Sequence, residues 1–179
     1  MENLKFIDVQ EEHLEMIREW RNSPEVSKYM YSDNFISAED QKRWFERIKR
    51  DKNSKYWVIN FENQDIGLVY LNNINKHLNS CEWGFYLGPA DVKGKGIGQK
   101  LMSYICKYVF EELKLNKLMA QVFKFNERSL YLHEKLGFRR EAYYREHCFK
   151  NEKYEDVIGL AILKKEYEQL KFAYSNSDQ

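Results

Sequence analysis

The sequence predicts a mixed α/β fold with a mostly antiparallel sheet of about seven strands and with about four to five helices. Two periodic patterns support this class. Apolar and polar residues alternate over several short runs, as in half-buried strands, whereas other runs repeat their apolar residues at helical spacing. A third observation is the order strand, glycine-rich loop, helix, strand in the middle of the chain, which predicts a parallel pair within the sheet.

The N-terminal part predicts one strand and then helices. Residues 4–9 alternate between apolar and polar side chains, and the apolar residues that follow recur at helical spacing: Leu14, Ile17 and Trp20. Ser23 and Pro24 predict a further helix start, because Ser is a common N-cap and Pro suits the first helical position. Ser37 and Asp40 resemble a capping box, so another helix is expected to begin there.

Residues 56–87 change to a period of two, which predicts three antiparallel strands. The turns between them are expected at residues 63–65, which read Asn-Gln-Asp, and around residues 76–79. Three residues of the third strand share one face: Glu82, Gly84 and Tyr86. A carboxylate beside a residue without a side chain is well placed to look into a cleft.

The second half predicts a helical crossover and a final hairpin. Apolar residues recur at near-helical spacing from Ile97 to Leu113, and residues 116–126 are again strand-like. A further helix is expected to end at Gly137, because Gly commonly follows a helix C-terminus. Residues 139–149 and 154–163 are expected to pair as the last hairpin.

The chain length is that of one domain, and we find no internal repeat or linker. We therefore expect a single domain over residues 1–170. The mostly polar tail is expected to fray from Glu166, with residues 171–179 disordered.

The composition narrows the class of partner. Lys plus Arg (29) nearly balances Asp plus Glu (28), so the net charge of +1 gives no reason to expect nucleic acid or a membrane. The three cysteines are widely spaced and odd in number, which argues against a disulfide framework and against a metal site. No apolar stretch has the length of a signal peptide core or a membrane span. We expect a cytoplasmic protein that acts on a small molecule.

A glycine-rich loop precedes the central helix and reads Lys93-Gly94-Lys95-Gly96-Ile97-Gly98-Gln99. Closely spaced glycines let the backbone approach a ligand, and amide N–H groups at a helix start favour a phosphate. The spacing fits neither the nucleotide P-loop nor the dinucleotide fingerprint. A glycine-rich turn that only caps the helix is the alternative interpretation.

This loop resembles the pyrophosphate loop of the GCN5-related N-acetyltransferases, which bind acetyl-coenzyme A (acetyl-CoA). The first residue there is usually Arg or Gln, and Lys93 keeps the positive charge. Asn126-x-x-Ser129 and the following Leu132 to Phe138 resemble the second signature of the family. The resemblance covers nearly the whole chain. It implies a V-shaped sheet in which the strands ending near Leu87 and Phe125 splay apart to admit the pantetheine arm.

The resemblance also implies which residues bind acetyl-CoA. The backbone of Tyr86 and Leu87 would pair with the pantetheine amides, and the side chains of Asn126 and Ser129 would contact the pantetheine or adenylate portion. The pyrophosphate would bind the loop: Lys93, Gly94, Lys95, Gly96, Ile97, Gly98 and Gln99.

Two residues are expected to be catalytic. Glu82 is assigned as the general base, acting directly or through water, because acetyl transfer requires a neutral amine. Most relatives carry Tyr at the position of His133, where it protonates the sulfur of the departing coenzyme. Histidine can do the same, or it can act as a hydrogen-bond donor or as a core imidazole.

The acceptor assignment depends on a shorter resemblance. Trp20-Arg21-Asn22 together with Met30-Tyr31 is similar to acetyltransferases of the pseudaminic acid pathway, which act on the 4-amino group of a UDP-linked amino sugar. It implies that Arg21 binds a phosphate or carboxylate and that Met30 and Tyr31 contact a ring.

Alternatives stay open for the acceptor and for catalysis. Relatives acetylate protein N-termini or small amines, and a catalytically silent acyl-CoA-binding sensor is a third interpretation. The choice between monomer and homodimer stays open as well.

Overall fold

The computed structural model describes residues 4–88 and 96–177, with side chains up to residue 171. The strands are β1 (Leu4–Asp8), β2 (Lys55–Phe61), β3 (Gln64–Asn75), β4 (Ser80–Leu87), β5 (Lys117–Phe123), β6 (Arg139–Lys150) and β7 (Lys153–Leu163). The helices are α1 (Leu14–Asn22), α2 (Pro24–Ser27), α3 (Ala38–Arg50), α4 (Ile97–Lys107), α5 (Glu127–Lys135) and α6 (Lys164–Ser177). The strands form one seven-stranded sheet in the order β1-β2-β3-β4-β5-β7-β6, so the predicted fold class is confirmed.

The chain divides into two compact units. Unit 1 comprises residues 1–73 and 83–97, and unit 2 comprises residues 74–82 and 98–179. The boundary in β4 falls between Glu82 and Trp83. The single domain expected over residues 1–170 stays a prediction.

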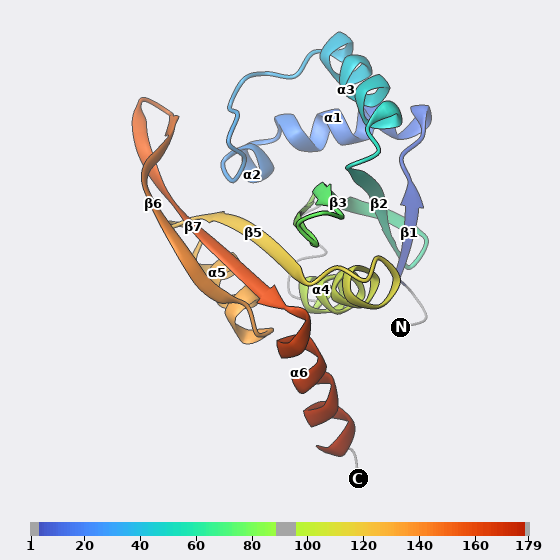
Figure 1. Cartoon of the computed structure of the whole chain (residues 1–179). Coiled ribbons are helices and arrows are strands. Elements are labelled where there is room, and N and C mark those ends of the chain that lie inside the picture. Colours follow the sequence, from blue (N-terminus) through green and yellow to red (C-terminus); the bar gives the residue numbers. More distant parts are fainter. Residues whose placement is uncertain (1–3, 89–95, 178–179) are drawn as a thin grey trace. The chain divides into compact units, whose positions relative to one another are not determined.

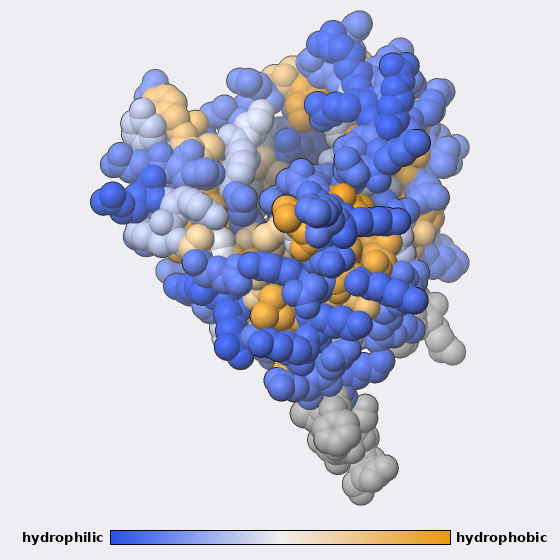
Figure 2. Space-filling view, in the orientation of Figure 1, coloured by the Kyte–Doolittle hydropathy of each residue, from blue (hydrophilic) through white to orange (hydrophobic). Residues whose placement is uncertain are grey.

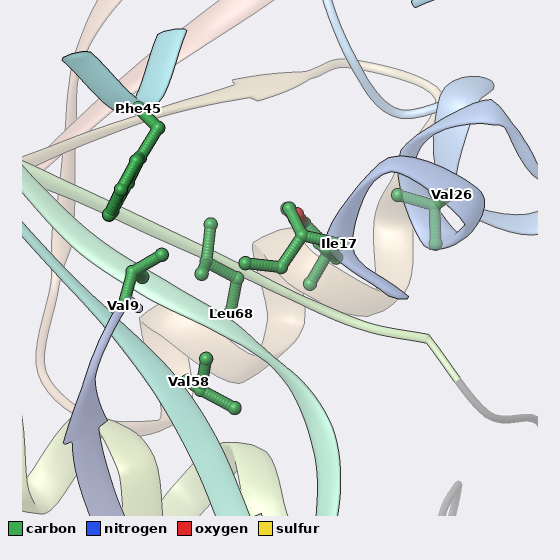
Figure 3. Close-up of a cluster of buried hydrophobic side chains, with 7 residues drawn as sticks. Val9, Ile17, Val26, Phe45, Val58 and Leu68 are labelled. Carbon is green, nitrogen blue, oxygen red and sulfur yellow. The ribbon is translucent and has the colours of Figure 1, made fainter. Parts of the chain in front are cut away.

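Unit 1 is built around an apolar core that β1, β2 and β3 share with α1, α2 and α3 (Figures 1 and 3). β2 pairs antiparallel with both β1 and β3, as the alternating pattern predicts. The buried side chains of this core are Val9, Ile17, Val26, Phe45, Val58, Leu68 and Tyr86. Burying such side chains away from water provides the main driving force that holds α1 and α3 on the sheet.

Two helix starts of unit 1 differ in how they are capped. Ser37 and Asp40 form the predicted capping box, because the Ser37 hydroxyl accepts from the Asp40 N–H and the Asp40 carboxylate accepts from the Ser37 N–H. Pro24 occupies the first position of α2, also as predicted. The N-cap bond expected from Ser23 is not formed, since its hydroxyl donates instead to the carbonyl of Trp20.

Unit 2 contains the parallel pair and the final hairpin. β4 and β5 pair in parallel from Ser80↔Lys117 to Glu82↔Met119, which confirms the predicted crossover connection. β7 pairs antiparallel with β5 on one side and β6 on the other (Figure 1). α4 continues into a π-helical segment at Tyr108–Glu112.

The segment after β7 differs from the expected fraying tail. It forms α6, which extends away from the end of β7 (Figure 1). Tyr167 donates a hydrogen bond to Glu111 at 2.9 Å, and Arg139 forms an ion pair with Glu166 at 3.1 Å. A Cβ added to Gly137 would lie 2.4 Å from the side chain of Leu170. Leu170 of α6 therefore packs directly against the backbone of Gly137. These contacts, which single-sequence periodicity does not reveal, explain why the helix forms.

No helix in the described ranges, 4–88 and 96–177, is long and apolar enough to cross a membrane. The cytoplasmic location expected from the sequence stays a prediction.

Candidate active site

The described part of the glycine-rich loop begins at Gly96, directly before α4. Lys93, Gly94 and Lys95 lie outside the described residues. Gly96 has a φ of +70°, which glycine adopts readily, and a Cβ added there would meet nothing within 4 Å. Ile97 is buried, whereas Gln99 is exposed. Gly96 therefore presents backbone beside open space at a helix start, an arrangement that fits the pyrophosphate of acetyl-CoA.

Glu82 lies in unit 2 on the last residue pair of the parallel ladder, opposite Met119. Its neighbour Cys81 is fully buried and lies near Cys106 of α4, so Glu82 projects from the opposite face of the sheet. On that face, the next residue along β5 is the exposed Gln121. Glu82 itself is half-buried. A carboxylate in this position can reach a solvated substrate.

The second motif forms the start of α5. Asn126 is the N-cap, and its side-chain oxygen accepts a hydrogen bond from the Ser129 N–H at 3.3 Å. This bond explains the Asn-x-x-Ser spacing in local terms. The side-chain oxygen of Asn126 is therefore engaged in capping, and its predicted contact with the coenzyme stays a prediction.

His133 lies further along α5 and is only 4% exposed. Its Nδ1 lies 2.7 Å from the carbonyl oxygen of Ser129, and its ring makes an edge contact with Phe138, with ring centroids 5.1 Å apart. Burial lowers the pKa of His133 below its ordinary value, although the bond to Ser129 partly opposes this effect. Tyr131, two residues earlier in α5, is 66% exposed and so does not share the buried position of His133.

In unit 1, Arg21 of α1 lies beside Tyr86 of β4. The guanidinium carbon is 6.0 Å from the centroid of the Tyr86 ring. Among the described residues, the buried Nη1 of Arg21 and the buried hydroxyl of Tyr86 have no hydrogen-bond partner. Burial raises the pKa of Tyr86, so this phenol stays protonated at neutral pH. Two buried polar groups with unused hydrogen-bonding capacity thus lie together, which is rare in folded proteins.

Further aromatic side chains pack against the core that contains Tyr86. Trp44 makes an edge contact with Tyr56, and Tyr56 stacks on Tyr70 with ring centroids 5.6 Å apart. The end of Tyr70 lies over Gly84, where an added Cβ would be 2.3 Å from the phenol oxygen. The space beside Gly84 is therefore filled by Tyr70, and the cleft into which Glu82 is expected to look stays a prediction. The side chain of Tyr86 belongs to the core of unit 1, and the expected pairing of its backbone with the pantetheine stays a prediction.

The segment between α2 and α3 carries the other predicted acceptor residues. Met30 is half-buried against the core of unit 1, and Tyr31 is 44% exposed. Asn22 closes this loop by two hydrogen bonds of 2.9 Å with the N–H and the carbonyl of Ile36. Sequence reasoning assigned no role to Asn22, although it lies within the Trp-Arg-Asn segment.

The predicted site residues therefore form separate groups. Arg21, Met30 and Tyr86 share one core in unit 1. Hydrogen bonds join Asn126, Ser129 and His133 at α5 in unit 2. Glu82 of β4 belongs to the same unit. Leu87 is half-buried at the end of β4 in unit 1.

Comparison with known proteins gives consistent results. A family model described as an acetyltransferase (GNAT) domain matches residues 3–139. Two proteins named acetyltransferase PseH, from two strains of Campylobacter jejuni subsp. jejuni, are 36% and 37% identical over 133 residues, covering 74% of this chain and 81% of each relative. Spermidine N(1)-acetyltransferase of Escherichia coli K12 is 24% identical over 165 residues, covering 92% of this chain and 88% of the relative. The crystal structure of spermidine N-acetyltransferase from Vibrio cholerae in complex with CoA and spermine is similar in fold, with a TM-score of 0.87 and 25% identity, covering 93% of this chain and 99% of that one.

Proposed function

The chain belongs to the GNAT acetyltransferase family, and from that premise we propose that it acetylates the 4-amino group of a UDP-linked amino sugar. It is an acetyl-CoA-dependent N-acetyltransferase that acts on an amine. The sugar acceptor is supported by two relatives named acetyltransferase PseH and by the resemblance of the segment from Trp20 to Tyr31 to acetyltransferases of the pseudaminic acid pathway.

The observation that carries this acceptor is the Arg21–Tyr86 pair. A buried hydrogen-bond donor without a partner costs the folded protein about 1–3 kcal/mol. An amine substrate whose oxygen atoms accept a hydrogen bond from Arg21 would therefore bind more tightly. A guanidinium binds phosphate and carboxylate oxygens with particular strength. The nearby Tyr56, Tyr70 and Trp44 rings suit a sugar or base ring. A nucleotide-linked sugar offers both kinds of group.

A polyamine is the second candidate acceptor, because several relatives are named spermidine acetyltransferases. Spermidine is a polycation, and the positively charged guanidinium of Arg21 would repel it. This charge argument favours the sugar nucleotide. Protein N-termini stay as the remaining alternative acceptors.

Acetyl-CoA supplies the acetyl group as a reactive thioester. Gly96 and the start of α4 would hold its pyrophosphate, and α5 would contact the pantetheine arm. Glu82 would accept a proton from the acceptor amine, directly or through a water molecule. Glu82→Gln removes this basicity with little change in shape. It should lower kcat by about 100-fold or more and leave KM for acetyl-CoA unchanged; an unaltered kcat would exclude Glu82 as the base.

A thiol-release assay tests the acceptor. The chain is incubated with acetyl-CoA and with UDP-linked 4-amino sugars, spermidine or N-terminal peptides in turn. We expect release only with the amino sugars. Thiol release with spermidine alone would identify a polyamine as the substrate and contradict the sugar proposal. Binding of acetyl-CoA without thiol release in any of the reactions would indicate a silent sensor.

A matched pair of variants tests Arg21. Arg21→Met should raise KM for the amino sugar about 10- to 100-fold, because it removes a charge-assisted hydrogen bond. KM for acetyl-CoA should stay as in the unmodified chain. Arg50→Met, at an exposed position of α3 in the same unit, is the control and should change neither constant. Equal behaviour of the two variants would contradict a role of Arg21 in acceptor binding.

A further inference from the structure

His133 is held in one defined orientation inside unit 2. Its Nδ1 is within 2.7 Å of the Ser129 carbonyl oxygen, and its ring meets Phe138 at an interplanar angle of 89°. Both neighbours belong to the same short stretch of chain: Ser129 is in the first turn of α5, and Phe138 is three residues beyond its end, immediately before β6. The ring therefore connects the beginning of α5 with the short connection to β6.

The Ser129 contact determines where the imidazole carries its proton. A backbone carbonyl can only accept a hydrogen bond, so Nδ1 must be the donor. In a neutral imidazole with its proton on Nδ1, Nε2 has a lone pair and no proton. Such a ring can accept a hydrogen bond at Nε2, but it has no proton to transfer from that atom. Protonation of a leaving thiolate by Nε2 would require the imidazolium, whose formation burial disfavours.

We propose that His133 is a positioning residue, which holds the Ser129 carbonyl through Nδ1–H and so fixes the first turn of α5, and that it does not protonate the thiolate of the coenzyme. The proposal depends on the proposed function only in assigning that turn to acetyl-CoA binding. It departs from the role implied by the family resemblance, in which the residue at this position acts as the acid.

The hydrogen bonds around Ser129 show what would be positioned. The Ser129 N–H donates to the carbonyl and to the side chain of Asn126, at 3.0 and 3.3 Å, while the Ser129 carbonyl accepts from His133. Both backbone groups of this residue are thus fixed from opposite sides. Loss of the imidazole bond would leave the Ser129 carbonyl with only its helical bond from the backbone N–H of His133, and it would leave the N-cap in place.

Two substitutions separate the two ring nitrogens. The amide nitrogen of Asn occupies nearly the same position as Nδ1 of His, so His133→Asn retains a donor for Ser129 and removes Nε2. The longer Gln side chain places its amide closer to the position of Nε2, so His133→Gln retains a polar group there and loses the short-range donor. Steady-state kcat and KM are measured for both variants in the thiol-release assay.

The proposal predicts that His133→Asn keeps kcat and KM for acetyl-CoA within about twofold of the unmodified chain. His133→Gln should raise KM for acetyl-CoA about three- to tenfold, the effect of one lost neutral hydrogen bond, with a smaller change in kcat. The opposite result, in which His133→Asn loses kcat by about 100-fold and His133→Gln retains it, would identify Nε2 as the reacting atom and overturn the proposal.

A spectroscopic measurement tests the tautomer without activity. Long-range ¹H–¹⁵N correlation spectra of the folded, unmodified chain at pH 7.5 distinguish a ring protonated on Nδ1 from one protonated on Nε2, and the signal is assigned by its loss in His133→Asn. A neutral ring protonated on Nδ1 is expected. A proton on Nε2 would overturn the proposal even if the chain transferred acetyl groups, whereas the expected tautomer in a chain without transferase activity would count against the proposed function alone.

Discussion

His133 and Arg21 are basic side chains that differ in whether they can lose their charge. An imidazole can lose its charge, so His133 is accommodated in the apolar interior as a neutral ring. A guanidinium cannot, so Arg21 must keep its charge beside Tyr86. The first side chain therefore suits a positioning role, and the second suits recognition of an anionic or oxygen-rich molecule.

The lowered pKa of His133 predicts a loss of stability in mild acid. The unfolded chain takes up the proton near pH 6.5, whereas the folded chain resists it, so the free energy of unfolding falls as pH drops below about 6.5. This loss is at most about 1.4 kcal/mol per pH unit, and it levels off below the pKa of the folded state. Urea unfolding at pH 7.5 and pH 5.5 measures it.

Substitution of the ring should remove this part of the pH dependence. His133→Asn is expected to lose less stability between pH 7.5 and pH 5.5 than the unmodified chain. His77→Asn, at an exposed position, is the control and should keep the slope of the unmodified chain. Identical slopes in all three proteins would show that His133 is not buried as a neutral ring.

Gly96 allows a test of the loop with little disturbance of the fold. Asn tolerates a positive φ better than most residues, and a side chain here would meet no described protein atom. Gly96→Asn should therefore weaken acetyl-CoA binding by about tenfold or more while lowering the melting temperature by only a few degrees. Calorimetric titration and thermal unfolding measure the two effects. Unchanged affinity would show that the coenzyme does not approach Gly96.

Residue types and spacing were sufficient to select several site residues, but not to assign their contacts. The Asn-x-x-Ser spacing indicated Asn126 and Ser129, and the structure shows that it also specifies an N-cap. The burial of Tyr86 could not be predicted, because strand alternation places it on the same face as Glu82 without revealing what covers that face. Asn22 was missed because its partner, Ile36, is distant in sequence.

At the scale of secondary-structure elements, Asn22 fixes the segment between α2 and α3. Asn22→Asp keeps an acceptor for the Ile36 N–H but places a negative charge against the Ile36 carbonyl. We expect KM for the acceptor amine to rise several-fold, because Met30 and Tyr31 lie in this segment, with KM for acetyl-CoA unchanged. Asn53→Asp, at an exposed turn of the same unit, is the control. An equal rise in both KM values would indicate general destabilisation instead.

Helix starts that neighbouring residues specify could be predicted from the sequence, whereas departures from regular helix geometry could be predicted only in part. The Ser37–Asp40 capping box is specified by four consecutive residues, and its bonds form as expected. The central helix showed apolar residues every fourth position from Ile97, a longer period than that of an α-helix. The π-helical turn at Tyr108–Glu112 is consistent with this longer apolar period, because a π-helix has more residues per turn than an α-helix. Val109 and Phe110 are buried in this turn.

The order of strands in the sheet depends on pairings that local patterns do not specify. The sequence predicted the hairpin of β6 and β7 but not which of them borders β5. The composition of the two strands does distinguish them: residues 157–162 of β7 are all apolar or Gly and are buried, whereas β6 is largely polar and exposed. A strand covered on both faces belongs inside a sheet, and a charged strand suits its edge.

At the scale of the whole molecule, the near balance of charge predicts a solubility minimum close to neutral pH. The isoelectric point is about 7.7, and proteins near zero net charge associate more readily. The rings of Phe149 and Tyr154, at the end of the hairpin between β6 and β7, are also exposed. Figure 2 shows hydrophobic surface (orange) at the tip of this hairpin. Light scattering at constant ionic strength should be greatest near pH 7.7 and should fall at pH 6.5 and pH 9. A scattering profile independent of pH would contradict this expectation.

The close approach of Tyr70 to Gly84 has a consequence for engineering the range of accepted amines. Because even a methyl group at position 84 would need the space that the phenol oxygen of Tyr70 occupies, the two positions cannot vary independently. A library that randomises position 84 alone would mostly return displaced aromatic rings, whereas shortening residue 70 first would make many residues acceptable at 84. Evolution toward a different substrate would therefore be expected to proceed through paired substitutions, with the tyrosine changing before the glycine.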